Sequence, residues 1–194
     1  PEVQAEVGFD CTVVLPATHD TGSAWLAVPA RNDRAVYLSS GTWSLLGVEN
    51  TVPITSAASA AANFTNEGGY GGTYRYLKNI MGLWMIQSVR RELGEHAPNG
   101  TRPTFPELIA AAKEASGYPG LVNADDDRFL APNSMIGEIT AACAEAGYPA
   151  PATTGEVMQA IYNSLADDYR PAKPDRQNLR KRQHCGRRQP GRIP

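Results

Sequence analysis

The chain has 194 residues, 42% of them hydrophobic, which is enough for one ordinary domain with a real core or for parts of two. It contains no apolar run of about 18 residues, so we expect no transmembrane helix. Its three cysteines (Cys11, Cys143 and Cys185) are too few and too scattered for a disulfide framework or a zinc site. We therefore expect a reducing, cytoplasmic setting.

The near-neutral net charge of −2 hides an uneven distribution. Residues 170–194 carry 9 of the 18 basic residues and a single acid, Asp175, whereas the preceding 169 residues carry 9 basic and 19 acidic residues. This tail has almost no apolar content and cannot bury enough surface to offset the entropy lost on ordering. We expect an acidic globular body followed by a disordered basic tail.

The first half of the chain reads mainly as short strands and turns. We predict strands at 11–15, 35–38 and 43–48, a small-residue helix at 23–28, a tight turn at 39–42, and a loop over 50–72 with a short strand near 62–65. The second half reads as helices, predicted at 77–91, 104–115, 134–146 and 154–169. Thr104 with Glu107 has the spacing of a capping box, and Gly147 ends the third helix. Early strands and late helices indicate an α/β or α+β fold.

One candidate for chemistry is Asp20, which follows a predicted strand and opens a predicted helix. A carboxylate at the positive end of a helix dipole is suited to act as a general base toward a substrate hydroxyl. The residues alone favour a simpler interpretation, in which Asp20 is only an N-cap. His19 is equally ambiguous.

Two glycine-containing segments allow the same two interpretations. In the turn at 39–42, Gly41 lets a phosphate approach the backbone while the hydroxyl of Thr42 donates to it, but an ordinary hairpin turn has the same composition. The composition of segment 66–69 likewise favours an ordinary turn over a binding site.

The remaining polar candidates favour structural roles. Lys78, Asn79 and Gln87 are expected on the solvated face of an apolar helix, with Asn79 and Gln87 sharing that face. The acidic run 125–127 is expected to be a solvated loop, because three adjacent carboxylates do not converge on one ion. The sequence contains no Walker loop, nucleophile–base pair or metal-ligand cluster.

Taken together, six segments resemble the rhamnulokinase branch of the FGGY carbohydrate kinases. They are 17–24 (ATHDTGSA), 37–44 (YLSSGTWS), 62–69 (ANFTNEGG), 76–84 (YLKNIMGLW), 126–132 (DDRFLAP) and 161–166 (IYNSLA). The resemblance covers about residues 8–169. It implies an α/β fold, the actin-like or ribonuclease-H-like ATPase fold of sugar kinases, in incomplete form. Residues 1–35 would end the N-terminal kinase domain, 36–169 would form part of the C-terminal domain, and 170–194 would be the basic tail.

The resemblance also assigns roles to single residues. Asp20 would be the catalytic base that accepts the sugar hydroxyl proton, and His19, Thr21 and Asn79 would bind the sugar. Thr42 would meet the phosphates of ATP, and Gln87 would lie by the nucleotide. The family reaction uses ATP and Mg²⁺ to convert L-rhamnulose into L-rhamnulose 1-phosphate. Phosphoryl transfer of this kind needs positioning, a proton acceptor and stabilised phosphate charge.

Two family segments are absent from the sequence as written. One is the N-terminal half with the first phosphate-binding hairpin, and the other is the adenosine-binding strand followed by Gly-Gly-Gly. Shifting the back-translated tail by one base lets residues 184–190 accommodate Ile-Val-Gly-Gly-Gly-Ser-Gln. We therefore expect that an insertion of one base or a deletion of two near Tyr169 and Arg170 put the tail out of frame.

These departures leave three hypotheses. A rhamnulokinase fragment would have little or no activity by itself, although the complete enzyme would be an ATP- and Mg²⁺-dependent phosphotransferase. A kinase for another ketose, such as xylulose or fuculose, is the second hypothesis. The third is a non-catalytic module whose basic arm binds nucleic acid, but the arm has no aromatic residue for base stacking. We expect no membrane partner, and the sequence does not predict an oligomeric state.

Overall fold

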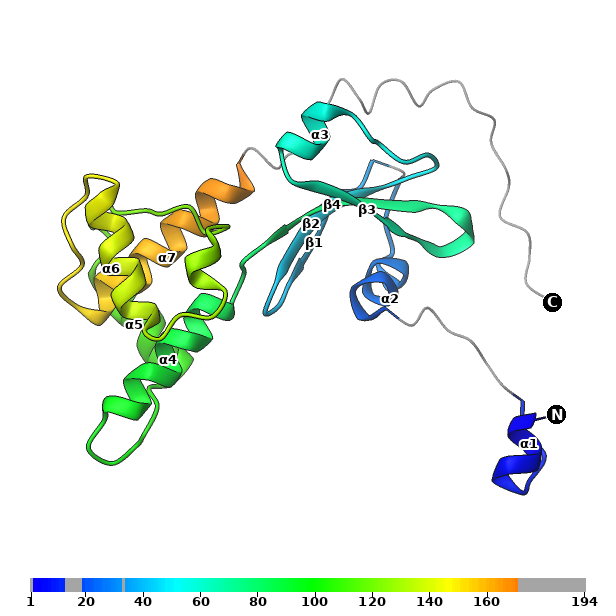
Figure 1. Cartoon of the computed structure of the whole chain (residues 1–194), viewed down its shortest axis with the longest axis horizontal. Helices are drawn as coiled ribbons and strands as arrows, with labels where there is room; N and C mark the ends of the chain where they lie inside the picture. Colours follow the sequence, from blue (N-terminus) through cyan, green and yellow to red (C-terminus); the bar gives the residue numbers. More distant parts are fainter. Residues whose placement is uncertain (1, 13–18, 33, 171–194) are drawn as a thin grey trace.

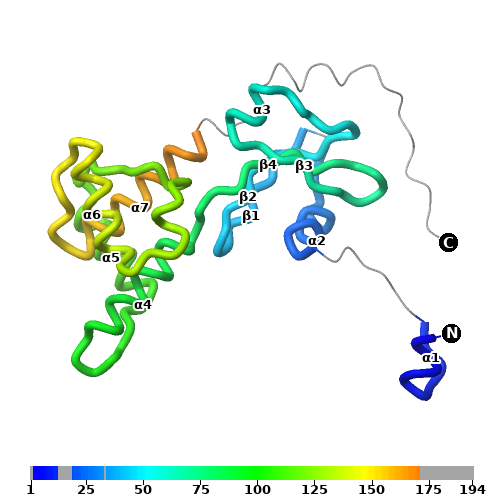
Figure 2. Tube along the Cα trace, viewed as in Figure 1, coloured from blue at the N-terminus to red at the C-terminus, as the bar shows by residue number. Residues whose placement is uncertain are grey.

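The computed structural model describes residues 2–12, 19–32 and 34–170. Its elements are α1 (Glu2–Val7), α2 (Asp20–Ala27), β1 (Tyr37–Ser40), β2 (Ser44–Asn50), α3 (Ala57–Ala61), β3 (Phe64–Gly68), the 3₁₀ turn η1 (Tyr70–Gly72), β4 (Tyr74–Ile80), α4 (Trp84–His96), α5 (Phe105–Glu114), the 3₁₀ turn η2 (Asp127–Phe129), α6 (Met135–Glu145) and α7 (Thr154–Tyr169). Helices α4–α7 gather at one end of the molecule, beside the sheet (Figures 1 and 2).

The sheet has four strands in the order β1-β2-β4-β3, and every neighbouring pair is antiparallel. Strands β1 and β2 form a hairpin, while β4 enters between β2 and β3 (Figure 1). Gly47 of β2 lies opposite Leu77 of β4, where an added Cβ would lie 2.2 Å from the Tyr76 carbonyl oxygen. The absence of a side chain therefore permits the close approach of these two strands.

The register divides the side chains of β2 and β4 between two faces. Leu45 lies opposite Asn79, and both belong to the face that also carries Leu77. Leu46 lies opposite Lys78 on the other face. The first face packs with α2, in a small cluster of Trp25, Leu45, Leu77 and the half-buried Tyr37. The second face joins the larger core.

The larger core lies between the sheet and the helices. Leu46 and Ile80 of the sheet pack in one cluster with buried side chains of α4, α5, α6, α7 and η2, among them the fully buried Phe129 of η2 and Met158 and Ile161 of α7. The exposed sides of the helices carry the charged residues, as expected for amphipathic helices. The second face of the sheet thus packs against the helical core, and the first face packs against α2.

Three of the predicted helices are confirmed. Thr104 caps α5 and forms the expected capping box with Glu107, Ser134 caps α6, and Thr153 caps α7 through a second capping box with Glu156. The predicted strands at 35–38 and 43–48 are found as β1 and β2, displaced by one or two residues. The predicted small-residue helix is found as α2, which begins at Asp20.

The helix predicted at 77–91 is wrong in its first part. Residues 74–80 form β4, and the helix begins only at Trp84. Lys78 and Asn79 therefore lie on a strand, and Asn79 shares no helix face with Gln87. The short strand predicted near 62–65 is found as β3, but the loop predicted around it also contains α3 and η1. The segment 66–69 begins inside β3 instead of forming a turn. The strand predicted at 11–15 lies largely outside the described residues; 11 and 12 are in neither helix nor strand.

Ser164 ties the connection after α5 to α7. Its hydroxyl donates to the carbonyl of Ala160 and accepts the backbone N–H of Val122, at 2.7 and 2.8 Å, and both bonds are buried. Replacing Ser164 with alanine would leave the Val122 N–H unsatisfied. We expect the variant to lose about 1–2 kcal/mol of unfolding free energy, measured by urea denaturation, whereas Ser116→Ala at an exposed position should change it by less than about 0.5 kcal/mol.

Among the described residues, no helix combines the length and the apolar character needed to cross a membrane.

Candidate active site

A cavity of about 540 Å³ opens on the α2 side of the sheet. Three parts of the chain surround it: the start of α2, the turn between β1 and β2, and the first face of the sheet. Its lining residues are His19, Asp20, Thr21, Ser39, Gly41, Thr42, Trp43, Leu45, Glu67 and Asn79. This volume is in the range of sites for small molecules, and polar groups line it from all three sides.

Asp20 stands at the mouth of this cavity with a carboxylate side chain that is 93% exposed. The N-cap position of α2 belongs to His19, so the interpretation of Asp20 as an N-cap is wrong. Asp20 is the first helical residue, and its Oδ1 accepts the backbone N–H of Thr21 at 2.6 Å.

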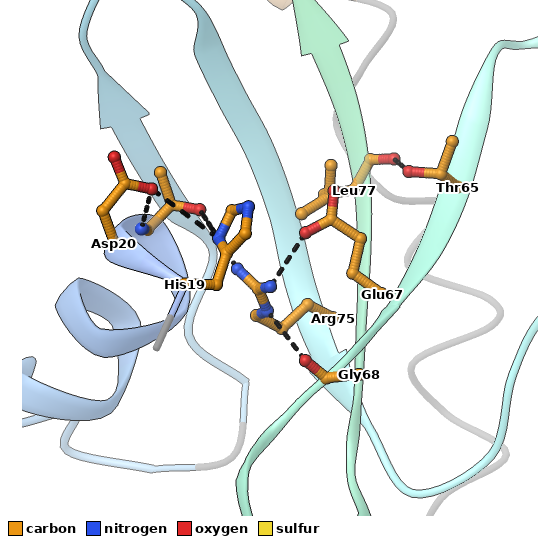
Figure 3. A network of polar contacts seen from close by, with 8 residues as sticks. His19, Asp20, Thr65, Glu67, Gly68, Arg75 and Leu77 are labelled. Carbon is orange, nitrogen blue, oxygen red and sulfur yellow. Dashed lines mark hydrogen bonds and ion pairs between the residues drawn. The ribbon is translucent and has the colours of Figure 1, made fainter. Parts of the chain in front are cut away.

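The neighbours of Asp20 form a short polar chain. The Thr21 hydroxyl lies 2.8 Å from Nδ1 of His19, and the same ring nitrogen lies 3.7 Å from Oδ1 of Asp20. The first turn of α2 therefore presents an imidazole, a carboxylate and a hydroxyl to one cavity (Figure 3). Such a group set suits the hydroxyls of a polyol or sugar.

The turn between β1 and β2 is held in place by the start of α4. The backbone N–H groups of Leu83 and Trp84 donate to the carbonyls of Gly41 and Thr42, each at 3.0 Å. Gly82 makes this approach possible, since a Cβ there would lie 2.7 Å from the Ser44 nitrogen. Thr42 is thus fixed by its backbone while its exposed side chain faces the cavity.

The floor of the cavity comes from alternate residues of the sheet. Asn79 and Leu45 face each other across β4 and β2, and Glu67 lies opposite Arg75 across β3 and β4. Asn79 is half-buried and lines the cavity from this floor. Its position follows from β4 being a strand, because positions 75, 77 and 79 share one face.

Five of the six residues expected at the site line this single cavity: His19, Asp20, Thr21, Thr42 and Asn79. Gln87 does not line it. It is exposed on α4, where its backbone N–H donates to the carbonyl of Leu83, the residue that contacts the turn at Gly41. Gln87 therefore lies one helical turn from the segment that supports Thr42.

Sequence reasoning gave no role to Arg75 and judged Glu67 to be part of a turn. Arg75 donates a hydrogen bond to the Thr21 hydroxyl, and Glu67 lines the cavity. No local pattern could have found both, because Arg75 shares a face with Asn79 only if residues 74–80 form a strand, and Glu67 meets Arg75 only through the register of β3 with β4.

The acidic run 125–127 has structural roles, which corrects the expectation of a wholly solvated loop. Asp125 forms an ion pair with Lys78 at 2.9 Å, and Asp126 caps η2 by accepting the N–H of Arg128. Within the described ranges, no three acidic, histidine or cysteine side chains converge on a metal position. Mg²⁺ is commonly held by one or two carboxylates together with substrate phosphates, so a Mg²⁺ ion bound with ATP does not need a closed protein cage.

The family model for the C-terminal domain of the FGGY family of carbohydrate kinases matches residues 36–172. Among curated proteins, the chain is 49% identical over 172 residues to a rhamnulokinase of Oceanobacillus iheyensis, an alignment that covers 89% of this chain and 35% of the relative. It is 51% identical over 164 residues to a rhamnulokinase of Halalkalibacterium halodurans, covering 84% and 33%. The chain thus spans about a third of the length of these relatives. It belongs to the FGGY family of carbohydrate kinases, and its antiparallel sheet and helices are part of the ribonuclease-H-like fold of these enzymes.

Proposed function

We propose that this chain carries the sugar-facing part of a kinase that transfers the γ-phosphate of ATP to L-rhamnulose, giving L-rhamnulose 1-phosphate and ADP. The observation that carries the proposal is the single cavity in which the Asp20 carboxylate, three further polar side chains and the Thr42 turn meet. The substrate is chosen because the two relatives above are named rhamnulokinases. Such an enzyme would work in the cytoplasm, where ATP is available.

In the proposed reaction, His19, Thr21 and Asn79 bind sugar hydroxyls and orient the reacting hydroxyl toward Asp20. Asp20 accepts its proton while the sugar oxygen forms a bond to the γ-phosphorus and the bond from that phosphorus to the ADP oxygen breaks. The Thr42 hydroxyl, which lines the same cavity, donates to a phosphate oxygen. Mg²⁺ bound with ATP would spread the phosphate charge. Gln87, on the adjacent helix, would contact the nucleotide.

The sugar preference is tested on a complete kinase that contains this segment. We expect the ratio kcat/KM for L-rhamnulose to exceed the ratios for xylulose and fuculose by at least about tenfold, which is the discrimination that one well-placed hydrogen bond provides. The measurement is ADP release with saturating ATP and Mg²⁺. A higher ratio for either of the other ketoses would refute the assignment of L-rhamnulose while retaining the kinase. The 194-residue chain assayed alone should release no ADP above the background.

We propose that the basic tail, residues 170–194, is translated out of frame; all of it but Arg170 lies outside the described residues. Sequencing the coding DNA across Tyr169 and Arg170 tests this directly. A surplus base, or two missing bases, followed by codons for the glycine-rich motif supports the proposal. An unbroken frame contradicts it, and the basic arm would then be tested for salt-sensitive nucleic-acid binding that is lost when the arm is deleted.

A further inference from the structure

We propose that Arg75 is a positioning residue that orients the Thr21 hydroxyl toward His19, and thereby fixes the tautomer in which His19 presents its Nε2–H to the cavity. The proposal rests on the proposed role of α2 in binding the sugar. The inference adds a residue, Arg75, that orients the sugar-binding side chains. It also assigns which of these side chains donate and which accept hydrogen bonds.

Arg75 is buried between the sheet and α2, with 4% of its surface exposed. Its Nη2 forms an ion pair with Glu67 Oε2 at 2.8 Å, and its Nε donates to the Gly68 carbonyl at 3.4 Å. The guanidinium also lies 5.9 Å from the centre of the Trp25 ring. Figure 3 shows this group between β3 and the start of α2. Its orientation is therefore determined from several sides.

The remaining guanidinium nitrogen reaches α2. Nη1 of Arg75 donates to Thr21 Oγ1 at 3.1 Å, over a separation of 54 residues. Gly22, the next residue, allows the close approach, because a Cβ there would lie 3.1 Å from the Arg75 guanidinium carbon. Arg75 thus holds the first turn of α2 against the sheet.

This contact favours one direction for the next hydrogen bond, the one in which the Thr21 hydroxyl proton is also used. A guanidinium has donors only, so Thr21 Oγ1 must accept from Arg75 through a lone pair. The single hydroxyl proton then points elsewhere, and Nδ1 of His19 lies 2.8 Å from Oγ1. When Nδ1 of a neutral imidazole accepts, the proton of the ring resides on Nε2. His19 would therefore offer a donor to a sugar oxygen, while Asp20 beside it offers an acceptor.

The chain contains its own reference for this measurement. Nδ1 of His96 lies 2.8 Å from the carbonyl oxygen of Glu92, which can only accept. Neutral His96 must therefore carry its proton on Nδ1. Long-range ¹H–¹⁵N NMR of the histidine-labelled 194-residue chain, at a pH about two units above the ordinary histidine pKa of ~6.5, distinguishes the two tautomers. The chain has a third histidine, His184, so His19→Gln and His184→Gln samples together assign the signals.

Three variants test the proposal. Thr21→Val removes the hydroxyl that lies between Arg75 and His19. It keeps the Arg75–Glu67 ion pair, so the buried charges are not disturbed. The double variant Arg75→Met with Glu67→Gln removes the guanidinium without leaving a buried unpaired carboxylate. Arg128→Met is the control, because Arg128 also pairs with carboxylates, those of Asp126 and Glu145, but lies outside the cavity.

We expect the wild-type spectrum to show His19 protonated on Nε2 and His96 on Nδ1. Thr21→Val and the double variant should lose the single tautomer of His19 and leave His96 unchanged. In the double variant, amide exchange in the first turn of α2 should also become about tenfold faster, as expected for a lost hydrogen bond to a charged group.

Wild-type His19 protonated on Nδ1, or a His19 spectrum that is the same in Thr21→Val as in the wild type, would overturn the inference. If the double variant does not fold, Thr21→Val decides alone. No sugar or nucleotide is present in these measurements, so their outcome is independent of whether the kinase acts on L-rhamnulose.

Discussion

Replacing Asp20 with asparagine in a complete kinase that contains this segment is expected to lower kcat by about 10³-fold, within the range of about 10²–10⁴ typical of general-base catalysis. Asparagine keeps the size of the side chain and an oxygen that accepts the Thr21 N–H. It has no carboxylate to take the proton of the sugar hydroxyl. The KM for the sugar should change little, because His19, Thr21 and Asn79 remain in place.

The matched control is Asp127→Asn, which changes an exposed carboxylate in η2, away from the cavity. Its kcat should equal that of the unaltered enzyme. Both variants are assayed by ADP release at saturating ATP and sugar, and a pH profile is recorded for each. An Asp20→Asn enzyme that retains more than about a tenth of the wild-type kcat would show that Asp20 is not the base.

The helices of the second half could be read from the sequence because their signals are local. Thr104 and Ser134 directly precede the helices that they cap, and the apolar residues of each helix recur at helical spacing. Both signals lie within a short stretch of sequence. The same local reasoning failed for β4. Leu77 and Ile80 are spaced as in a helix, yet this strand packs α2 on one face and the helical core on the other. A strand buried on both faces loses the alternation that identifies it.

The sequence named candidate-site residues that lie in short motifs, Asn79 among them. His19, Asp20 and Thr21 are neighbours in the chain, and Thr42 lies in a recognisable turn. The support for them is not local: the bond from Arg75 to Thr21 spans 54 residues. It depends on a register between β3 and β4 that no local pattern specifies.

Lys78 was expected on a solvated face, but the structure buries it between two carboxylates. Its Nζ lies 2.9 Å from Asp125 and 3.2 Å from Asp168, so one ammonium joins β4 to the connection after α5 and to the last turn of α7. Burial acts to lower the pKa of Lys78, but the hydrogen bonds and charges of Asp125 and Asp168 outweigh it, and the net pKa is raised. Burial, with the charge of Asp125, raises the pKa of Asp168 in spite of Lys78.

We expect Lys78→Met to lower the unfolding free energy at neutral pH by about 3 kcal/mol, because it leaves two largely buried carboxylates without their cation. For a domain of this size the change corresponds to a drop in Tm of about 10 °C. Lys113→Met is the control: Lys113 is exposed on α5, and its loss should cost less than about 0.5 kcal/mol. Equal stability of the two variants would mean that the ion cluster contributes nothing.

The pH dependence separates this ionic effect from lost packing. A raised lysine pKa stabilises the fold fully below the ordinary value of 10.5, and this contribution is lost as the pH rises through the folded-state pKa. The wild type should therefore lose stability above about pH 10.5, and Lys78→Met should lack that loss. In acid, Asp168, whose pKa is already raised by burial, becomes protonated and no longer needs a cation. The difference between variant and wild type should then shrink as the pH falls toward the ordinary aspartate pKa of 3.8, whereas a difference caused by packing alone would stay constant.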